Sequence, residues 1–333
     1  MKKRILSGMR PTGPLHIGHL AGALKNWVKL QDEYECYFMI ADWHALMSEY
    51  EDPKLIKEYT IEMMLDWLSC GIDINKSVLF VQSHVPEHLE LYMAFSLLTP
   101  LGWLERNPTY KEQLREIKGR DLTTYAFLGY PVLQAADIAL YKANTVPVGA
   151  DQLPHLELTR EILRRLHALY GKKIFPEPEA LLTDTPKLLG LDNRKMSKSY
   201  DNFIAINENP DEIKKKVQRM ITDPERVKLS DKGHPQKCTV FSYYKVFASE
   251  DKIKEVEHYC KSAHKGCTEC KSIMAELLIE YLSPIREKRK WLKERFKERV
   301  ITPWSECLKK AGETAKKTMA EIKEVLHIYE IQS

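Results

Sequence analysis

The sequence has no apolar run that approaches the roughly 18 residues needed to cross a bilayer, and it has no internal repeat or low-complexity tract. An excess of one charge is also missing, because 51 Lys and Arg oppose 47 Asp and Glu and leave +4 over 333 residues. Bulk charge therefore cannot bind nucleic acid, and any basic surface must be local. The first residues, Met-Lys-Lys-Arg-Ile-Leu-Ser-Gly, run into a glycine-proline loop and not into a signal-peptide core. We therefore expect a cytoplasmic protein with no membrane partner.

Short apolar runs alternate with helical spacing in the first half of the chain, whose overall composition of 44% hydrophobic and 29% charged residues is that of a globular protein. The predicted strands are residues 4–7, 37–41, 78–81 and 146–148, and the predicted helices are residues 16–30, 53–69, 86–98, 131–141 and 153–170. This alternation predicts an α/β fold with a Rossmann-type, doubly wound parallel sheet over residues 1–187. Residues 103–125 are polar and charged and indicate an excursion outside the sheet.

Strand signals nearly vanish after about residue 206, where Lys- and Glu-rich helical spacing takes over. We predict a second, all-helical domain over residues 188–333. Residues 1–200 carry a net charge of −1 and residues 201–333 a net charge of +5. Eight Lys and Arg against three Glu fall within residues 281–300. Such a run is typical of a solvated helix face and equally of a face that binds a polyanion.

The segment from Pro11 to His19, Pro-Thr-Gly-Pro-Leu-His-Ile-Gly-His, joins the first predicted strand to the first predicted helix. Ligands bind at this position in open parallel sheets. We expect His16 and His19 to share one face of the first helical turn, where unpaired backbone N–H groups can hold a phosphate. Gly18 between them would let a ligand approach the backbone. The alternative is a core helix with one hydrogen-bonded histidine, and a P-loop is excluded because no Gly-Lys-Ser/Thr follows.

A second segment, Arg-Lys-Met-Ser-Lys-Ser at 194–199, carries two lysines and two hydroxyls in a predicted loop. Such a cation cluster suits a polyphosphate, although an ordinary basic loop has the same composition. Together, the His-Ile-Gly-His and Lys-Met-Ser-Lys-Ser runs resemble the two signatures of class I aminoacyl-tRNA synthetases. Both occur in this sequence in the right order and without a departure.

Two further runs narrow the resemblance. Gly-Tyr-Pro-Val-Leu-Gln-Ala-Ala-Asp at 129–137, and Val-Pro-Val-Gly-Ala-Asp-Gln at 146–152 with His-Leu-Glu-Leu-Thr-Arg at 155–160, are similar to tryptophanyl-tRNA synthetases, over residues 4 to about 330. Asp137 is a carboxylate on a largely apolar helical face, which is costly to bury without a donor. The indole N–H of tryptophan is such a donor. A backbone amide or a nearby Arg is the alternative partner.

The resemblance implies a role for each matching position. It implies a tryptophan site with the indole nitrogen on Asp137, the ammonium and carboxylate near Tyr130, Gln134 and Gln152, and the ring against His44, Leu6, Val146 and Val148. It implies ATP contacts from Arg10, Pro11, Thr12, Gly18, His19, Gly149, Ala150, Asp151, Lys195, Met196, Ser197, Lys198 and Ser199. The implied catalytic groups are His16, His19, Lys195 and Lys198. Two positions depart from the family: many members carry Gln at residue 10 and an acidic residue at residue 150.

Seven cysteines are an odd number in a chain expected in the cytoplasm, so we do not expect disulfides. Cys238, Cys260, Cys267 and Cys270 follow the pattern C-x21-C-x6-C-x2-C. Four thiolates can bind Zn²⁺ or a [4Fe–4S] cluster, and the spacing alone slightly favours zinc. The resemblance implies the cluster, because a subset of tryptophanyl-tRNA synthetases carries a four-cysteine iron–sulfur motif of nearly this spacing. Zinc and free thiols remain as alternatives.

The resemblance also implies the reaction and its partners. Tryptophan would be activated with Mg²⁺-ATP to tryptophanyl-adenylate and then transferred to the 3′ end of tRNA(Trp). The helical domain would bind the anticodon, its last helix would pack back on the catalytic domain, and residues 103–130 would form a homodimer. Three alternatives stay open: a tyrosyl-tRNA synthetase, since a phenol can also donate to Asp137; a smaller nucleotidyltransferase; and a synthetase-like RNA-binding protein without activity.

Overall fold

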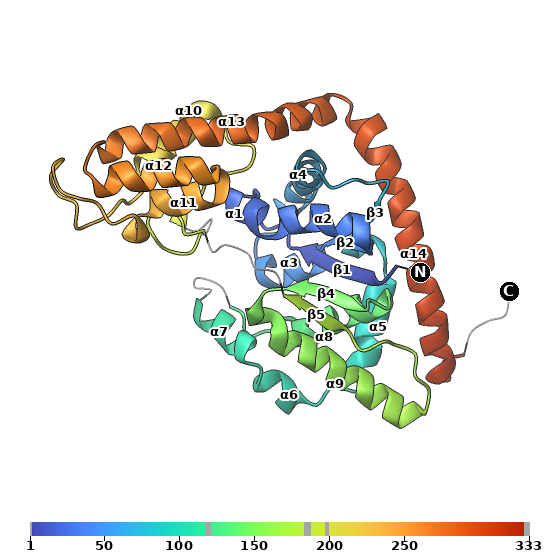
Figure 1. Cartoon of the computed structure of the whole chain (residues 1–333). Coiled ribbons are helices and arrows are strands. Elements are labelled where there is room, and N and C mark those ends of the chain that lie inside the picture. Colours follow the sequence, from blue (N-terminus) through green and yellow to red (C-terminus); the bar gives the residue numbers. More distant parts are fainter. Residues whose placement is uncertain (1, 117–120, 183–187, 197–199, 330–333) are drawn as a thin grey trace.

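The computed structural model describes residues 2–116, 121–182, 188–196 and 200–329. Five strands form one sheet in the order β3-β2-β1-β4-β5, and each neighbouring pair is parallel. The strands are β1 Arg4–Met9, β2 Glu35–Ile40, β3 Ser77–Val81, β4 Thr145–Val148 and β5 Glu179–Leu182. The predicted doubly wound parallel sheet is confirmed (Figure 1).

Helices cover both faces of the sheet and make up the second part of the chain. The first part contains α1 Ile17–His19, α2 Lys25–Glu33, α3 Asp42–Glu49, α4 Ile56–Ser69, α5 Glu87–Ser96, α6 Leu101–Glu105, α7 Pro108–Glu116, α8 Tyr125–Leu140 and α9 Leu153–Tyr170. The second part contains α10 Pro210–Gln218, α11 Thr239–Phe247, α12 Glu250–Lys261, α13 Cys267–Glu294 and α14 Thr302–Val325. Shorter turns of 3₁₀- or π-helix are η1 Leu20–Leu24, η2 Gln82–His84, η3 Ala150–Gln152, η5 Pro235–Lys237 and η6 Lys297–Ile301. Among the described residues, no helix is both long and apolar enough to span a membrane.

The central strands are buried on both faces, which explains why they read as continuous apolar runs. All of β3 and all of β2 except Glu35 are buried. In β2, Phe38 packs with α2 and α4 on one face, whereas Tyr37 packs with α5, α8 and α14 on the other. The chain runs outward from β1 to β3 and returns to β4 beside β1. The strand order therefore reverses between β1 and β4, which is where such sheets bind ligands.

Several elements differ from the sequence prediction, and three of them are informative. Helix α3 and edge strand β5 were not predicted, because each is short and carries no clear apolar period. Helix α8 begins at Tyr125, and Pro131 lies inside it and not at its start. The Thr124 hydroxyl caps α8 by accepting from the N–H of Phe127. Burial of 12 of the 16 residues of α8 outweighs the cost of about 3 kcal/mol for an internal proline.

The long helix α13 leads away from the cysteine-rich segment and toward the sheet (Figure 1). Helix α14 then runs back along the sheet, where Cys307, Ala311, Ala315 and Met319 share a buried core with β2 and β3. Beyond residue 188, all described elements of regular structure are helical. The predicted helical second part is thus confirmed.

The basic run at residues 281–300 is not a uniform solvent-facing surface. Arg289 is buried and its guanidinium forms ion pairs with Asp66, 2.7 Å away, and with Glu62, both on α4. Arg286 is half-buried and donates to the carbonyl oxygen of Ile279. The exposed basic residues of this run are Lys288, Lys290, Lys293, Arg295, Lys297 and Arg299. Interpreting all eight as one face was wrong, because Arg289 is turned toward α4 and Arg286 folds back on its own helix.

Candidate active site

A cavity of about 740 Å³ lies at the carboxyl ends of β1 and β4. All eight residues expected around tryptophan line it: Leu6, His44, Tyr130, Gln134, Asp137, Val146, Val148 and Gln152. Five positions expected at ATP also line it: Arg10, His19, Gly149, Asp151 and Lys195. The other described positions from these predictions are not part of the lining: Pro11, Thr12, His16, Gly18, Ala150 and Met196. Ser197, Lys198 and Ser199 lie outside the described residues.

Asp137 occupies the wall of this cavity and is 2% exposed. Its Oδ1 accepts hydrogen bonds from Nε2 of Gln82 at 2.8 Å and from Nδ1 of His88 at 2.6 Å. Its Oδ2 accepts from Nε2 of His44 at 2.8 Å. The three donors to Asp137 are the side chains of Gln82, His88 and His44. The sequence had suggested a backbone amide or an arginine as partner, and neither is among them. A carboxylate offers about four lone-pair positions, so three of them are used and one remains.

The hydrogen bonds determine the charge of Asp137. Burial raises the pKa of this carboxyl, but the hydrogen bonds that it accepts from His44 and His88 outweigh burial and lower the pKa to about 2. The group is therefore ionised at neutral pH. An ionised carboxylate with one open acceptor position can bind a single N–H or O–H donor inside the cavity.

Sequence reasoning missed Gln82 and His88, which hold Asp137 from behind. Gln82 follows β3 directly and His88 lies in the first turn of α5, and both are fully buried. The only available signal was that polar residues follow a buried strand, at the edge of the sheet where parallel strands end. The apolar lining residues Met39 and Phe127 were also missed.

Tyr130 and Gln152 are joined behind the cavity by a residue that does not line it. The Tyr130 hydroxyl lies 2.9 Å from Nε2 of His155, and Nδ1 of His155 lies 3.1 Å from Oε1 of Gln152. Gln152 in turn donates from Nε2 to Asp151 at 2.8 Å. His155 itself is 1% exposed.

The two histidines after β1 lie next to each other as predicted, although His16 precedes α1 and does not belong to its first turn. His16 is the N-cap of α1, and its Nδ1 accepts from the N–H of Gly18 at 3.2 Å. The N–H of His16 donates to Nδ1 of His19, also at 3.2 Å, and the two rings are 3.8 Å apart. Because each Nδ1 accepts a backbone proton, each neutral ring carries its own proton on Nε2.

Gly18 permits a close approach, but the approaching groups belong to the protein. A Cβ at Gly18 would lie 2.9 Å from Nδ1 of His16 and 3.1 Å from Sδ of Met196. Met196 is buried and packs in the same core as α1, while its neighbour Lys195 lines the cavity. Lys195 and Met196, the first two residues of the Lys-Met-Ser-Lys-Ser segment, therefore lie next to the turn formed by residues 16–19.

The four clustered cysteines converge in the helical part of the chain. Burial and the nearby Cys238, Cys270 and Cys267 raise the pKa of the Cys260 thiol to about 11. A Cβ at Gly233 would lie 2.5 Å from Sγ of Cys260, so only glycine fits at this wall. Among these described cysteines, no three Sγ atoms all lie within 4.8 Å of one another. The mutual effects of these four thiols on their pKa values place them near one another.

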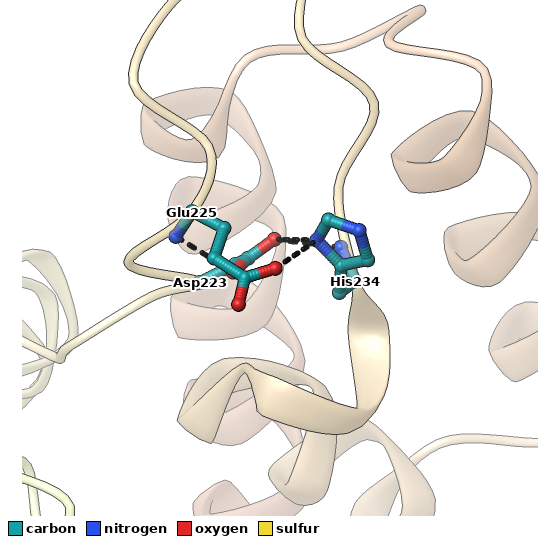
Figure 2. A group of neighbouring side chains, drawn as sticks. All are labelled: Asp223, Glu225 and His234. Atoms are coloured by element: carbon teal, nitrogen blue, oxygen red, sulfur yellow. Dashed lines mark hydrogen bonds and ion pairs between the residues drawn. The ribbon is translucent and has the colours of Figure 1, made fainter.

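A second group of possible metal ligands, Asp223, Glu225 and His234, lies just before Cys238 (Figure 2). Oδ2 of Asp223 accepts from the backbone N–H of His234 at 2.7 Å and from Nδ1 of its ring at 2.9 Å. Oδ1 of Asp223 accepts from the backbone N–H of Glu225 at 3.0 Å. These hydrogen bonds account for the group, which we assign to the structure of the loop that leads to the cysteines.

Comparison with known proteins adds sequence and structural relatives. Residues 1–283 match the family described as class I tRNA synthetases (W and Y). A tryptophan–tRNA ligase of Thermotoga maritima is 50% identical and one of Aquifex aeolicus is 43% identical, each over 98% of this chain and 99% or 100% of the relative. The crystal structure of tryptophanyl-tRNA synthetase from Campylobacter jejuni complexed with ADP and tryptophan is similar with a TM-score of 0.88 at 34% identity. It covers 98% of this chain and is itself covered completely.

Proposed function

The chain belongs to the class I tRNA synthetases for tryptophan and tyrosine, and we propose that the cavity between β1 and β4 carries out both of its chemical steps. The chain is a tryptophan–tRNA ligase, like its relatives of similar length. This function replaces the tyrosyl, nucleotidyltransferase and non-catalytic alternatives. Tryptophan, Mg²⁺-ATP and tRNA are its partners.

The open acceptor position of Asp137 is the observation that carries the assignment of the tryptophan site. In our proposal the indole N–H donates to this position, since it is the only donor on the tryptophan side chain. The ring then lies among the apolar side chains Leu6, Val146 and Val148 and against His44. Tyr130, Gln134 and Gln152 are left to receive the ammonium and carboxylate groups.

ATP occupies the neighbouring part of the cavity in this proposal. Residues after β1 bind it from one side, namely Arg10, Pro11, Thr12, Gly18 and His19. Residues after β4 bind its ribose, namely Gly149, Ala150 and Asp151. The third set covers adenine and pyrophosphate, namely Lys195, Met196, Ser197, Lys198 and Ser199. Support comes from the positions of Arg10, His19, Gly149, Asp151 and Lys195 in the cavity wall.

In the first step the tryptophan carboxylate attacks the α-phosphorus of ATP in line, and the bond to the pyrophosphate oxygen breaks. No covalent enzyme intermediate is needed, so the protein contributes positioning and neutralisation of charge. His16 and His19 would donate through Nε2–H, and Lys195 and Lys198 would neutralise the departing pyrophosphate. In the second step a ribose hydroxyl at the tRNA 3′ end attacks the activated carbonyl, and AMP leaves.

We assign residues 1–187 to a catalytic domain and residues 188–333 to a helical domain that binds the tRNA anticodon. The exposed basic residues at the end of α13 and in η6 support a contact with the phosphate backbone. Helix α14, which packs on the sheet, ties the helical domain to the catalytic domain. A tRNA substrate and free cysteine thiols also support the expected cytoplasmic location.

Four thiolates at a common wall fit a metal centre, and we propose that Cys238, Cys260, Cys267 and Cys270 hold a [4Fe–4S] cluster. A single Zn²⁺ needs its four sulfurs roughly 3.8 Å apart, given a tetrahedral site with Zn–S bonds of about 2.3 Å. No three of the four Sγ atoms lie within 4.8 Å of one another, so the set is wider than a single Zn²⁺ site, and this supports the larger cluster. Such a group would supply a structural crosslink between α11, α12 and α13 and takes no part in the ligation steps.

We also propose a homodimer. Four large apolar side chains are strongly exposed on α5, α6 and α8: Met93, Leu97, Leu101 and Tyr125. Leu97 and Tyr125 are 68% and 67% exposed, and their apolar surface supports an interface with a second copy. Tyr125 lies within the predicted 103–130 segment, and Leu101 lies two residues before it.

ATP–pyrophosphate exchange with each of the twenty amino acids offered separately tests the proposed function. We expect exchange with tryptophan alone. Exchange with tyrosine would overturn the assignment of Asp137 to the indole N–H. Absence of exchange with every amino acid, in folded protein that binds tRNA, would overturn the activity itself.

A further inference from the structure

His155 is a buried histidine that touches two residues of the cavity without lining it. It lies in the first turn of α9, directly behind Tyr130 and Gln152, and bonds to each through a different ring nitrogen. We propose that His155 is a positioning residue that turns the Tyr130 hydroxyl so that only its oxygen lone pairs face the substrate ammonium. The inference rests on the proposed tryptophan site and adds a residue that this site did not include.

The direction of each hydrogen bond follows from the chain of partners. Nε2 of Gln152 donates to the Asp151 carboxylate, so Oε1 of Gln152 is the atom facing His155. A carbonyl oxygen only accepts, and Nδ1 of His155 must therefore carry the ring proton. Burial lowers the pKa of His155 to about 4, with a smaller contribution from His44, so the ring has no second proton at neutral pH.

Nε2 of His155 is then an acceptor, and Tyr130 is its donor. Burial raises the pKa of the Tyr130 phenol, which keeps its proton for this bond. With the proton directed at His155, the Tyr130 oxygen presents two lone pairs and no hydrogen to other partners. An ammonium group has three donors and no acceptor, so it binds this orientation of the phenol and is repelled by the opposite one.

The network also explains why a histidine suits this position. A hydrogen bond to a charged group is stronger than one between neutral groups. If the Tyr130 proton pointed at the substrate ammonium, the protein would lose such a bond and the substrate would bind more weakly.

The Thr159 hydroxyl donates to the backbone carbonyl of His155 at 2.9 Å. Thr159 lies on the same helix but is not part of the network. Thr159 is buried as completely as His155, which makes it a matched control.

The test measures dissociation constants for tryptophan and for indole-3-propanoate, which has the same ring and carboxylate but no ammonium group. We expect His155→Leu to weaken tryptophan binding about tenfold and to leave indole-3-propanoate binding unchanged. His155→Gln should restore most of the affinity, because its amide oxygen can accept the Tyr130 proton. Thr159→Val should bind both ligands as the wild type does. If His155→Leu fails to fold, His155→Asn replaces it, since the shorter amide retains Gln152 but does not reach Tyr130.

A double-mutant cycle separates positioning from general packing. In a Tyr130→Phe background, His155→Leu should cause no further loss of tryptophan affinity, and the maximal rate of exchange should stay within about twofold in each His155 variant. Equal weakening of both ligands, additive effects with Tyr130→Phe, or no change in tryptophan affinity would each overturn the proposal. Failure of the wild-type protein to bind tryptophan would instead contradict the proposed function.

Discussion

His88 holds Asp137 in the cavity wall: Nδ1 of its ring lies 2.6 Å from Oδ1 of the carboxylate. Its other nitrogen, Nε2, lies 2.9 Å from the hydroxyl of Tyr141. Burial raises the pKa of Tyr141 well above its usual range, so the phenol keeps its proton and donates it to Nε2. His88 then carries its proton on Nδ1 and donates to Asp137. Tyr141 in the core thus donates to His88, and His88 donates to the Asp137 carboxylate in the cavity wall.

Replacing Asp137 with Asn should raise the KM for tryptophan by one to two orders of magnitude, because the charged acceptor of the indole N–H is lost. The Asn amide would also turn one donor toward the Gln82 and His88 donors. Exchange rates measured against tryptophan concentration check this expectation. Asp32→Asn, which changes an exposed carboxylate paired with Lys76, serves as the control. An unchanged KM for tryptophan would remove Asp137 from the site.

Lys198→Ala should slow tryptophan activation by about two to three orders of magnitude, because a cation that neutralises the leaving pyrophosphate is lost. Tryptophan affinity should stay nearly intact, since this lysine acts on ATP. Single-turnover formation of the adenylate and equilibrium tryptophan binding measure the two effects. Lys54→Ala, at an exposed ion pair with Asp52, is the matched control. Equal loss of both properties would indicate misfolding and not a catalytic role.

Stability should depend on pH through His155. The pKa of His155 in the folded protein is about 4, below the ordinary value of 6.5. As the pH falls below 6.5, His155 is protonated in the unfolded chain but stays neutral in the folded protein. Stability is therefore full above the unfolded pKa and falls by up to about 3 kcal/mol as the pH approaches the folded pKa. Urea unfolding of wild type and His155→Gln over this range checks the effect. The variant should lose less stability on acidification, and parallel losses would contradict the pKa assignment.

Protein purified without oxygen should contain iron and show the broad visible absorbance of an iron–sulfur cluster. Cys267→Ser and Cys270→Ser should each lose most of the iron, because each removes one of four thiolate ligands. Cys307→Ser should keep it, since Cys307 is buried on α14 in the core beside β3. Metal analysis distinguishes the outcomes, and zinc in place of iron would overturn the cluster while retaining the four-cysteine site.

Arg289→Met should lower the free energy of unfolding by about 3 to 5 kcal/mol, because the buried Asp66 carboxyl, which is 2% exposed, would lose its charged partner. Lys290→Met on the exposed side of the same helix should change stability by less than about 0.5 kcal/mol. Thermal unfolding followed by circular dichroism measures both. A loss no larger than that of Lys290→Met would show that α13 does not depend on this ion pair.

Local patterns in the sequence were enough to predict the kind of fold and the neighbourhood of the site. Buried parallel strands are short apolar runs, so β2 and β3 could be located, and the unbroken apolar period of α9 predicted its bounds correctly. The histidine turn follows the first strand, and the position of strand ends then implied a ligand site there. The start of helix α8 was predicted at Pro131, six residues too late. A proline usually marks the beginning of a helix, but here packing of the helix stabilises a proline in its interior.

The order of residues along the chain was sufficient to predict the parallel sheet with its helical second part, the order of the two signature segments, and part of the cavity lining. The charge and orientation of those residues depend on contacts between elements that are far apart in the chain. Gln82 and His88 lie 55 and 49 residues from Asp137 in the chain, and Arg289 lies 223 residues from Asp66. The physical reason is that burial and hydrogen bonds from distant elements determine a side chain's protonation, and these have no local pattern in the sequence.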